Sequence, residues 1–433
     1  MKMKMRILSM VAALALAVPA ATIAADGMPI EPVDLPPSIQ QGVDMIYIDQ
    51  ELMPAGVQGD PADRLLQTAS LDEALAFDPF QSVHPIYSEL RRGMMRYRMR
   101  WGSLPDIQVP AGPVLKLGTK DERVYALRAR LGLPDGDAFD AALEKIVREY
   151  QQVHGLKVDG IVGNQMVASL NLGPRHYEQV LLVNLERARR LPVAEEQPRY
   201  ILVDSGSARI YLYENGKAVD SMRAIVGAQE TATPMMAALM RYVSVNPYWN
   251  VPPELVQSLI APNVLKEGLT YLSDRDYEVL SDWTDEAKPV DPATVDWRAI
   301  ANGEETKLLL RRGPGPYNSM GKIKFMLPND FGIYLHDYPD KAKFAVDDRW
   351  ISNGCVRVED AERLARWIFG YMPKGSDPKV EENVDLPEPI PVYMTYLTAA
   401  ATSDGVQFRA DPYQRDASVI ARYFSEPREI VSR

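Results

Sequence analysis

The sequence predicts an α+β protein of several domains, with a helical half followed by a mainly-β half. Its 433 residues correspond to two or three domains at roughly 150 residues each. Apolar residues recur with helical spacing between Asp121 and Leu170, whereas from Tyr200 onward apolar and polar residues alternate with a period of two. The first pattern is typical of amphipathic helices and the second of half-buried strands.

The first 25 residues have the layout of a secretory signal peptide. Three basic residues precede an apolar run from Ile7 to Val18, and small residues continue to Ala25. The sequence therefore predicts a signal peptide at 1–25 that is removed on export. An uncleaved membrane anchor is the alternative, although Ser9 and Pro19 interrupt a stretch that is barely long enough to span a bilayer.

The helical half contains two regions of different character. Residues 26–110 are rich in Pro and acidic residues at first and regain helical spacing after Ala62, which predicts a partly helical scaffold. Residues 121–170 carry three amphipathic stripes separated by turns that contain glycine, which predicts a compact unit of three helices. The three stripes are Val124 to Leu133, Phe139 to Tyr150 and Met166 to Leu170. A further helix, Tyr177 to Arg190, is expected to lead into the β half.

Strand-like segments dominate the second half of the chain. The pair Asn215-Gly216 predicts a tight hairpin turn between two of them. A connection of roughly 60 residues between Val251 and Arg312 interrupts the strand pattern, and it is far longer than the usual 4 to 6 residues. Its helix formers predict a helical insertion that covers a site as a lid, with a decorative subdomain as the alternative. The predicted strands are Tyr200–Asp204, Ala208–Tyr213, Ala218–Val226, Ile323–Met326, Gly332–His336 and Ile390–Leu397.

Composition excludes several classes of function. The 48 basic and 59 acidic residues give a formal charge of -11, which lacks the basic surface that a nucleic acid requires. The single cysteine, Cys355, excludes an internal disulfide and a thiolate zinc cluster. None of the four histidines is paired at metal-ligand spacing, so we expect neither a metal nor another cofactor.

The single cysteine follows one histidine in a setting that favours catalysis. The two-residue period places Tyr334 and His336 on one face of a predicted strand, and Cys355 follows 19 residues after His336 in a Ser-Asn-Gly turn. A thiol needs a neighbouring base to become a nucleophile near neutral pH, and imidazole is the usual one. The alternative is an inert, buried cysteine. An amphipathic stripe from Ala361 to Ile368 predicts a helix behind the turn, and we expect its N-terminus and His336 to lower the pKa of Cys355 below about 8.5.

The arrangement Ile-Tyr-Leu-His-Asp, 14 further residues and then Ser-Asn-Gly-Cys-Val-Arg-Val resembles the active-site signature of the L,D-transpeptidases, which share a YkuD-type catalytic domain. The similarity covers roughly Tyr200 to Asp416 and points to the large periplasmic branch of the family. One departure is Asn353, because many members have histidine directly before the Gly-Cys pair, and His336 is left as the base. The segment Asp121–Leu170 resembles the small helical peptidoglycan-binding domain of many cell-wall enzymes, through Tyr150-Gln151, Gly155-Leu156 and Asp159-Gly160.

The two resemblances imply a location and a domain plan. The protein is expected in the periplasm, where it would take part in peptidoglycan biosynthesis and cell-wall organisation and so affect cell shape. The implied plan is a signal peptide (1–25), a partly helical scaffold region (26–110), a peptidoglycan-binding-like helical domain (115–172), a mainly-β L,D-transpeptidase catalytic domain (198–400) with a helical lid insertion (251–312), and a C-terminal tail (401–433).

The resemblance also implies an activity. Cys355 would attack a peptidoglycan stem tetrapeptide, expel the terminal D-alanine and form a thioester, with His336 as the base. An amine acceptor would then take the acyl group and complete a 3-3 cross-link, and carbapenems are the implied inhibitors. The resemblance implies oxyanion or orienting roles for the backbone N–H groups of Gly354 and Cys355, the Tyr334 hydroxyl and the carbonyl of Asp337. It implies substrate binding by Arg357, Ser352, Asn353 and Trp249. Bracing of the turn is the alternative role for Arg357, and a place in the core is the alternative for Trp249.

Three other functions remain open from the sequence. With water as the acceptor, the same machinery would be an L,D-carboxypeptidase. With a lipoprotein as the acceptor or the substrate, it would link that lipoprotein to the wall or release it. In the third alternative the protein is a non-catalytic wall-binding protein, against which the presence of both Cys355 and His336 argues. The sequence assigns no protein partner.

Overall fold

The computed structural model describes residues 22–23, 29–30, 45–54, 82–282, 287–304 and 308–424. The predicted signal peptide (1–25) lies outside these ranges except for β1 (Thr22–Ile23), which pairs with β2 (Pro29–Ile30). The helical spacing predicted after Ala62 also falls outside them, up to residue 81. Within the described ranges, no helix is both long enough and apolar enough to cross a membrane.

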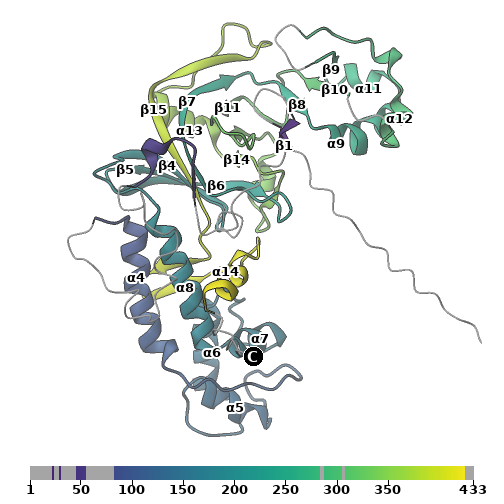
Figure 1. The fold of residues 1–433 in the computed structure, drawn as a ribbon. Coiled ribbons are helices and arrows are strands. Elements are labelled where there is room, and N and C mark those ends of the chain that lie inside the picture. Colours follow the sequence, from purple (N-terminus) through teal and green to yellow (C-terminus); the bar gives the residue numbers. More distant parts are fainter. Residues whose placement is uncertain are drawn as a thin grey trace, which may run out of the picture.

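The β half folds into a sheet that closes on itself, in the upper part of Figure 1. Its main strands are β4 (Arg199–Asp204), β5 (Arg209–Glu214), β6 (Lys217–Gly227), β7 (Met236–Val245), β11 (Ile323–Phe325), β12 (Leu335–Asp337), β14 (Val356–Val358) and β15 (Glu382–Thr395). Neighbours follow the order β11-β12-β14-β6-β5-β4-β15-β7, and β7 pairs again with β11. The pairs β12–β14 and β4–β15 are parallel, and the others in this ring are antiparallel. β3 (Ile46–Tyr47) adds to β7, and β13 (Trp350–Ser352) adds to β6.

Both faces of β4 are buried, which explains its continuous apolar run. Ile201 and Val203 point into the inner core, which α13 (Ala361–Phe369) also lines. Tyr200 and Leu202 point to the opposite face, where they pack against residues from the 45–53 segment. The predicted tight turn is present between β5 and β6, where Asn215 and Gly216 have φ angles of 49° and 74°. Two successive positive φ angles are what a type I′ hairpin turn requires.

The insertion folds around a small core of its own, at the upper right of Figure 1. Its elements are β8 (Trp249–Val251), α9 (Pro253–Leu255), η3 (Val256–Ile260), α10 (Ala261–Glu267), α11 (Thr270–Ser273), β9 (Tyr277–Leu280), η4 (Pro292–Thr294), α12 (Trp297–Ala301) and β10 (Leu309–Arg312). The expectation of a helical insertion is therefore incomplete, because β8, β10 and β9 form a sheet. These strands have three or four residues each, too few for a two-residue period to stand out. The role of the insertion as a lid stays a prediction.

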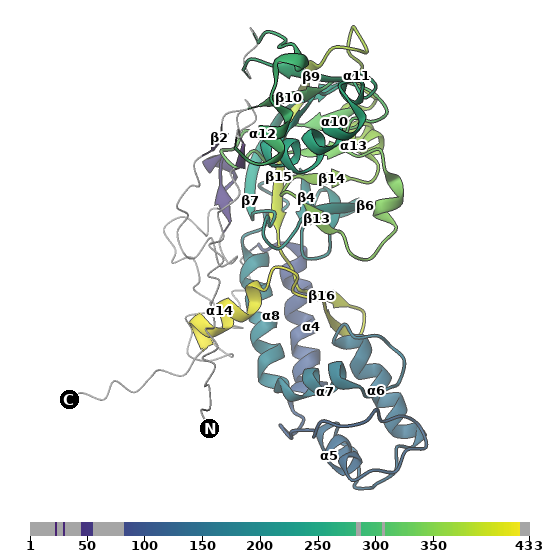
Figure 2. The same ribbon diagram turned by 90° about the vertical axis from the view of Figure 1, so that its right-hand side faces the viewer.

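The helical half forms one body, in the lower part of Figures 1 and 2, with a core built from residues within 83–188 and 399–424. Its helices are α4 (Pro85–Tyr97), η2 (Arg98–Gly102), α5 (Arg123–Arg130), α6 (Ala141–Val153), α7 (Asn164–Asn171) and α8 (Gly173–Arg189). The region 401–433 was expected to be a tail, and this expectation is wrong for its described part. β16 (Ala399–Thr402), β17 (Gly405–Phe408) and α14 (Arg415–Phe424) pack into the helical core through Val406, Phe408 and Val419. A Cβ at Gly93 of α4 would lie 2.6 Å from the carbonyl oxygen of Gly405, so only glycine allows this contact.

His154 lies at the centre of the helical body. Its ring stacks on Tyr150 at a centroid distance of 3.7 Å and lies 5.5 Å from Phe408 of the C-terminal hairpin. Nδ1 donates to the carbonyl of Tyr150 (2.8 Å), so Nε2 accepts from the hydroxyl of Tyr97 (3.2 Å). Burial lowers the pKa of His154 to about 3. The imidazole is therefore neutral and fully hydrogen-bonded in the folded protein.

We expect acid to destabilise the protein partly through His154. The folded pKa of about 3 lies below the ordinary value of 6.5, so this contribution is complete above pH 6.5 and is lost as the pH falls toward 3. One such histidine contributes about 1.4 kcal/mol per pH unit within this window. In H154Q, the slope of the unfolding free energy against pH, measured by urea titration between about pH 4 and 6, should be shallower by roughly this amount.

A matched control is H176Q, because His176 lies in α8 of the same body and is less buried. The control should change the slope less than H154Q does. Equal slopes for H154Q and the wild type would contradict the assignment, whatever the stability of the variant at neutral pH.

Candidate functional site

Two neighbouring strand ends bring Cys355 and His336 into one site. β12 and β14 are parallel, with His336 opposite Arg357. Cys355 directly precedes β14, and its Sγ donates to the carbonyl of Gly332, just before β12, at 3.4 Å. The N–H of Val356 donates to the carbonyl of Tyr334 at 3.1 Å, which fixes the relative register of the two strand ends. The closed sheet thus places the imidazole on β12 and the thiol just before the adjacent strand, β14.

The turn at Ser352–Cys355 is held by its own atoms. Ser352 is 2% exposed, and its Oγ donates to the carbonyl of Cys355 (2.7 Å) and accepts from the N–H of Gly354 (3.2 Å). Gly354 has a φ of 112°, a conformation that residues other than glycine rarely adopt. The predicted substrate-binding role of Ser352 is therefore corrected, because its buried hydroxyl shapes the turn.

The loop Gly227–Thr233, which was not predicted to be part of the site, clamps this turn. Thr233 Oγ1 donates to the carbonyl of Gly354 (2.7 Å), and Thr231 Oγ1 donates to the carbonyl of Ser352 (2.9 Å). A Cβ at Gly227 would overlap the carbonyl of Thr231, so glycine lets the loop fold tightly. The sequence signal was a glycine and two threonines in the connection after a strand, although nothing in it linked this connection to the cysteine turn.

His336 is buried, with a fixed tautomer. Its Nδ1 lies 2.6 Å from the carbonyl oxygen of Asp337, so Nδ1 carries the proton and Nε2 keeps a lone pair. Burial, and then the positive charges of Arg357 and Lys324, lower the pKa of His336 to about 3. The side chain of Asp337 binds elsewhere, to Lys341 at 2.7 Å and to a backbone N–H. The structure thus brings the carbonyl of Asp337, and not its carboxylate, to the imidazole.

The predicted low pKa of Cys355 is wrong. Burial raises the pKa of this thiol above its ordinary value, and hydrogen bonding with Tyr334 and the charges of Arg357 and Lys324 oppose that rise only in part. The expected helix start is also absent next to the thiol. The three residues after Cys355 form β14, and α13 begins only at Ala361, so a strand separates the helix N-terminus from the thiol.

The predicted oxyanion donors differ in availability. The N–H of Gly354 is bonded to Ser352, which corrects its predicted role as an oxyanion donor. In the part of the chain that the structure describes, no acceptor binds the N–H of Cys355. The Tyr334 hydroxyl donates weakly to Met320 Sδ (3.5 Å), and its pKa is raised well above the ordinary value by burial and by the nearby Cys355. Of the two backbone donors, only the N–H of Cys355 is therefore without an acceptor among the described residues, and the Tyr334 hydroxyl beside it has only a weak sulfur acceptor.

Two cations flank the thiol and the imidazole. The guanidinium of Arg357 lies over the ring of Tyr338 at 4.3 Å, and no carboxylate among the described residues pairs with it. Lys324 lies opposite His336 in β11 and pairs with Glu381 at 2.7 Å. Lys324 was not among the predicted site residues, although its place between the apolar residues of β11 was a usable signal.

The remaining two predicted residues occupy different surroundings. Asn353 is exposed at the tip of the turn, next to Cys355. Trp249 packs half-buried against the core of the insertion, with its ring 6.5 Å from that of Tyr277. This position favours the core alternative for Trp249.

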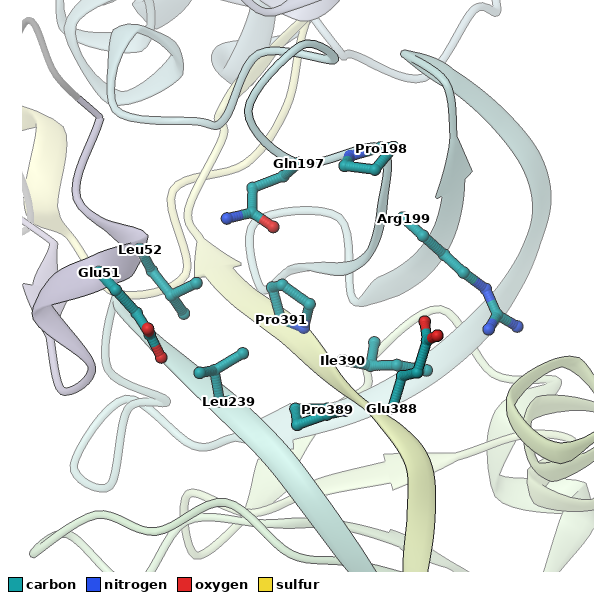
Figure 3. A pocket seen from close by; sticks show the side chains of 10 residues that line it. All are labelled: Glu51, Leu52, Gln197, Pro198, Arg199, Leu239, Glu388, Pro389, Ile390 and Pro391. Carbon is teal, nitrogen blue, oxygen red and sulfur yellow. The ribbon is translucent and has the colours of Figure 1, made fainter.

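A cavity of about 340 Å³ opens in another part of the β half (Figure 3). It contains none of the predicted site residues, so it is separate from the Cys355 site. Its walls come from the 45–54 segment, the start of β4, β7 and the proline-rich part of β15. The lining residues are Glu51, Leu52, Gln197, Pro198, Arg199, Leu239, Glu388, Pro389, Ile390 and Pro391.

The chain is similar to several proteins that are named as L,D-transpeptidases. The chain is 29% identical over 248 residues to the "Putative L,D-transpeptidase" of Haemophilus influenzae, which covers 56% of this chain and 49% of that protein. It therefore spans about half the length of this curated relative. A crystal structure of an L,D-transpeptidase from Xylanimonas cellulosilytica is 16% identical, with 66% of this chain and 98% of that chain covered and a TM-score of 0.21. A mutant L,D-transpeptidase from Enterococcus faecium is 13% identical, with 46% of this chain and 50% of that chain covered and a TM-score of 0.23.

Family models give the more specific result, since TM-scores this low add nothing to it. Residues 125–170 match the "Putative peptidoglycan binding domain", and residues 198–381 match the L,D-transpeptidase catalytic domain. Both resemblances read from the sequence are confirmed, as is the predicted α+β fold class with a mainly-β domain after a helical one. The domain of residues 198–381 belongs to the L,D-transpeptidase family.

Proposed function

We propose that this protein cross-links peptidoglycan as an L,D-transpeptidase, through a thioester on Cys355. One observation supports this function most strongly. The parallel pairing of β12 and β14 holds the thiol of Cys355 and an imidazole with a free Nε2 lone pair at adjacent strand ends. A nucleophile beside a base that is itself oriented by a third group is the usual arrangement for acyl transfer.

The first half-reaction forms the thioester. Sγ of Cys355 bonds to the carbonyl carbon of the third residue of a stem tetrapeptide, its proton moves to Nε2 of His336, and the carbonyl electron pair moves to oxygen. The N–H of Cys355 and the hydroxyl of Tyr334 bind this oxyanion. When the oxyanion collapses, the C–N bond breaks and His336 returns the proton to the leaving amine of D-alanine.

The resting site holds a neutral thiol and a neutral imidazole. Burial raises the pKa of Cys355 and lowers that of His336 to about 3, so a thiolate–imidazolium pair is unfavourable before substrate binds. Proton transfer therefore accompanies the attack of sulfur. Because no thiolate is stored in advance, oxyanion stabilisation carries a large share of the rate enhancement.

The second half-reaction transfers the acyl group. An acceptor amine loses a proton to Nε2 of His336 and bonds to the thioester carbonyl carbon, and the C–S bond then breaks with return of the proton to sulfur. With the side-chain amine of a second stem peptide the product is a 3-3 cross-link. With water the product is a free carboxylate, which is the L,D-carboxypeptidase alternative. An insertion that closes over the thioester would exclude water and favour the amine.

We propose substrate contacts from the charge pattern of the site. Stem peptides carry carboxylates close to the scissile bond, and Arg357 presents a partly exposed guanidinium beside His336. Asn353, exposed next to Cys355, supplies an amide at the rim. The peptidoglycan-binding domain would hold the enzyme on its polymer, in the periplasm, as the predicted signal peptide implies.

Intact mass spectrometry with a disaccharide tetrapeptide tests the proposed reaction. We expect an adduct on Cys355 that lacks the mass of D-alanine, followed by a cross-linked dimer. C355S should lose essentially all turnover, because a hydroxyl is far harder to ionise than a thiol. Turnover of C355S at the wild-type rate would contradict the proposal, and accumulation of tripeptide without dimer would favour the carboxypeptidase.

Carbapenems test the same nucleophile with a small acyl donor. The catalytic domain of an Enterococcus faecium L,D-transpeptidase has been described acylated by ertapenem. We expect a stoichiometric ertapenem adduct on Cys355, since ring opening needs only the nucleophile, the oxyanion donors and a proton for the leaving nitrogen. An adduct that maps to a serine would show that the nucleophile is assigned wrongly.

Alkylation by iodoacetamide measures the pKa of Cys355 directly, because this is the only cysteine. Only the thiolate reacts, and burial raises the pKa, so the rate should still be rising at pH values above about 8.5, the ordinary pKa of a thiol. R357Q should shift the midpoint of the alkylation rate against pH to a higher pH, because Arg357 lowers the pKa of Cys355. R366Q on the exposed side of α13 removes the same charge and should leave the midpoint in place. A wild-type midpoint of the pH–rate profile below 8.5 would contradict the raised pKa of Cys355.

A further inference from the structure

We propose that Thr233 and Tyr413 are positioning residues, which orient the Gly354–Cys355 peptide so that the N–H of Cys355 points at the developing oxyanion. The proposal deepens the function proposed above and rests on it. Neither residue touches the reacting atoms, since each acts through the peptide that carries the donor. Tyr413 lies in the C-terminal segment that was expected to be a tail.

The planar peptide bond between Gly354 and Cys355 couples the orientation of the two groups that it joins. The carbonyl of Gly354 and the N–H of Cys355 belong to one peptide unit, which is trans, so the two groups point in opposite directions. Thr233 Oγ1 binds that carbonyl at 2.7 Å and thereby fixes the direction of the N–H on the other side. A hydrogen bond to the carbonyl also polarises the unit and strengthens the N–H as a donor.

This peptide needs an external restraint. Gly354 has no side chain to resist rotation, and glycine populates positive and negative φ about equally readily. The hydrogen bond from its N–H to Ser352 holds only the preceding peptide unit. The carbonyl of Gly354 is held by Thr233, so loss of this hydroxyl frees the Gly354–Cys355 peptide to turn away from the site.

Thr233 is itself held in one orientation by a closed set of buried hydrogen bonds. Its Oγ1 accepts from the N–H of Gly227 (3.0 Å), so the hydroxyl proton is directed to Gly354. Its backbone N–H donates to the hydroxyl of Tyr413 (3.4 Å), which donates in turn to the carbonyl of Gly227 (3.0 Å). Thr233 is fully buried and Tyr413 is 7% exposed, so water does not compete for these groups.

Tyr413 is anchored from the helical body. Its ring stacks on Tyr396 at a centroid distance of 4.9 Å, and the guanidinium of Arg415 lies 5.0 Å from its ring centre. The next residue of α14, Asp416, forms a buried ion pair with Arg187 of α8 at 2.7 Å. The aromatic stack and this ion pair fix the position of the hydroxyl that supports the catalytic turn.

Two reactions of Cys355 separate positioning from general damage to the site. Acylation by ertapenem passes through an oxyanion, whereas alkylation by iodoacetamide displaces iodide without forming one. Loss of an oxyanion donor typically costs about 100- to 1,000-fold in rate. For T233V, which removes the hydroxyl at nearly constant volume, we expect the acylation rate constant to fall by about 10- to 100-fold while the concentration for half-maximal rate stays constant. Alkylation should change by less than about twofold at equal pH.

Further variants locate the effect. T233S keeps the hydroxyl and should retain the wild-type acylation rate, and Y413F should show a smaller loss than T233V. The matched control is Y393F, which removes a buried tyrosine hydroxyl in β15 that binds the carbonyl of Leu52. Y393F should acylate like the wild type. Equal losses in T233V and T233S, parallel losses of acylation and alkylation, or an equal loss in Y393F would each overturn the proposal.

An NMR measurement tests the orientation without any substrate. Because Cys355 is the only cysteine, labelling with ¹⁵N-cysteine gives a single amide resonance, that of the proposed donor. T233V and Y413F should shift this resonance and speed its hydrogen exchange, and Y393F should not. An unchanged resonance in both variants would overturn the positioning role. If the wild type forms no acyl adduct but the resonance responds, the proposed function has failed while the positioning of the peptide stands.

Discussion

The parallel pairing of β12 with β14 is the constraint on which the site depends. Cys355 directly precedes β14, and the pairing places it beside the start of β12. Cys355 and His336 therefore meet although His336 lies 19 residues earlier in the sequence. Closure of the sheet through β7 and β11 leaves these short strands no freedom to slip, since each has neighbours on both sides. The turn, the clamping loop and the two flanking cations are all arranged around this one pairing.

The same packing that fixes the geometry also keeps the site neutral. Burial disfavours the charged forms of both Cys355 and His336, and two nearby cations lower the pKa of the imidazole further. A neutral pair protects the thiol from unwanted oxidation, because the thiolate is the reactive form. In the proposed reaction, the charges on the imidazole and on the substrate oxygen therefore develop only during the attack of sulfur. In the proposed mechanism, the oxyanion donors and the residues that orient them therefore matter more than they would beside a preformed thiolate.

The sequence was sufficient for the features that depend on local pattern. The strand period predicted most of the sheet, and the spacing of His336, Cys355 and their neighbours carried the resemblance to the family. Features that depend on long-range contacts were missed. Nothing local reveals that Thr233 binds the cysteine turn, that residues after 400 complete the helical core, or that burial outweighs nearby charges at the thiol. The helix predicted behind Cys355 exists, but pairing on both sides draws the intervening residues into β14.

The protonation state of His336 tests the neutral resting site most directly. ¹⁵N shifts of histidine ring nitrogens distinguish the two neutral tautomers from the imidazolium, and H336Q assigns the signal among the four histidines. The structure predicts that His336 stays neutral with its proton on Nδ1, bound to the carbonyl of Asp337, from about pH 5 to 8. An imidazolium signal in this range that disappears in C355S would contradict the account, because it would show a stored thiolate–imidazolium pair.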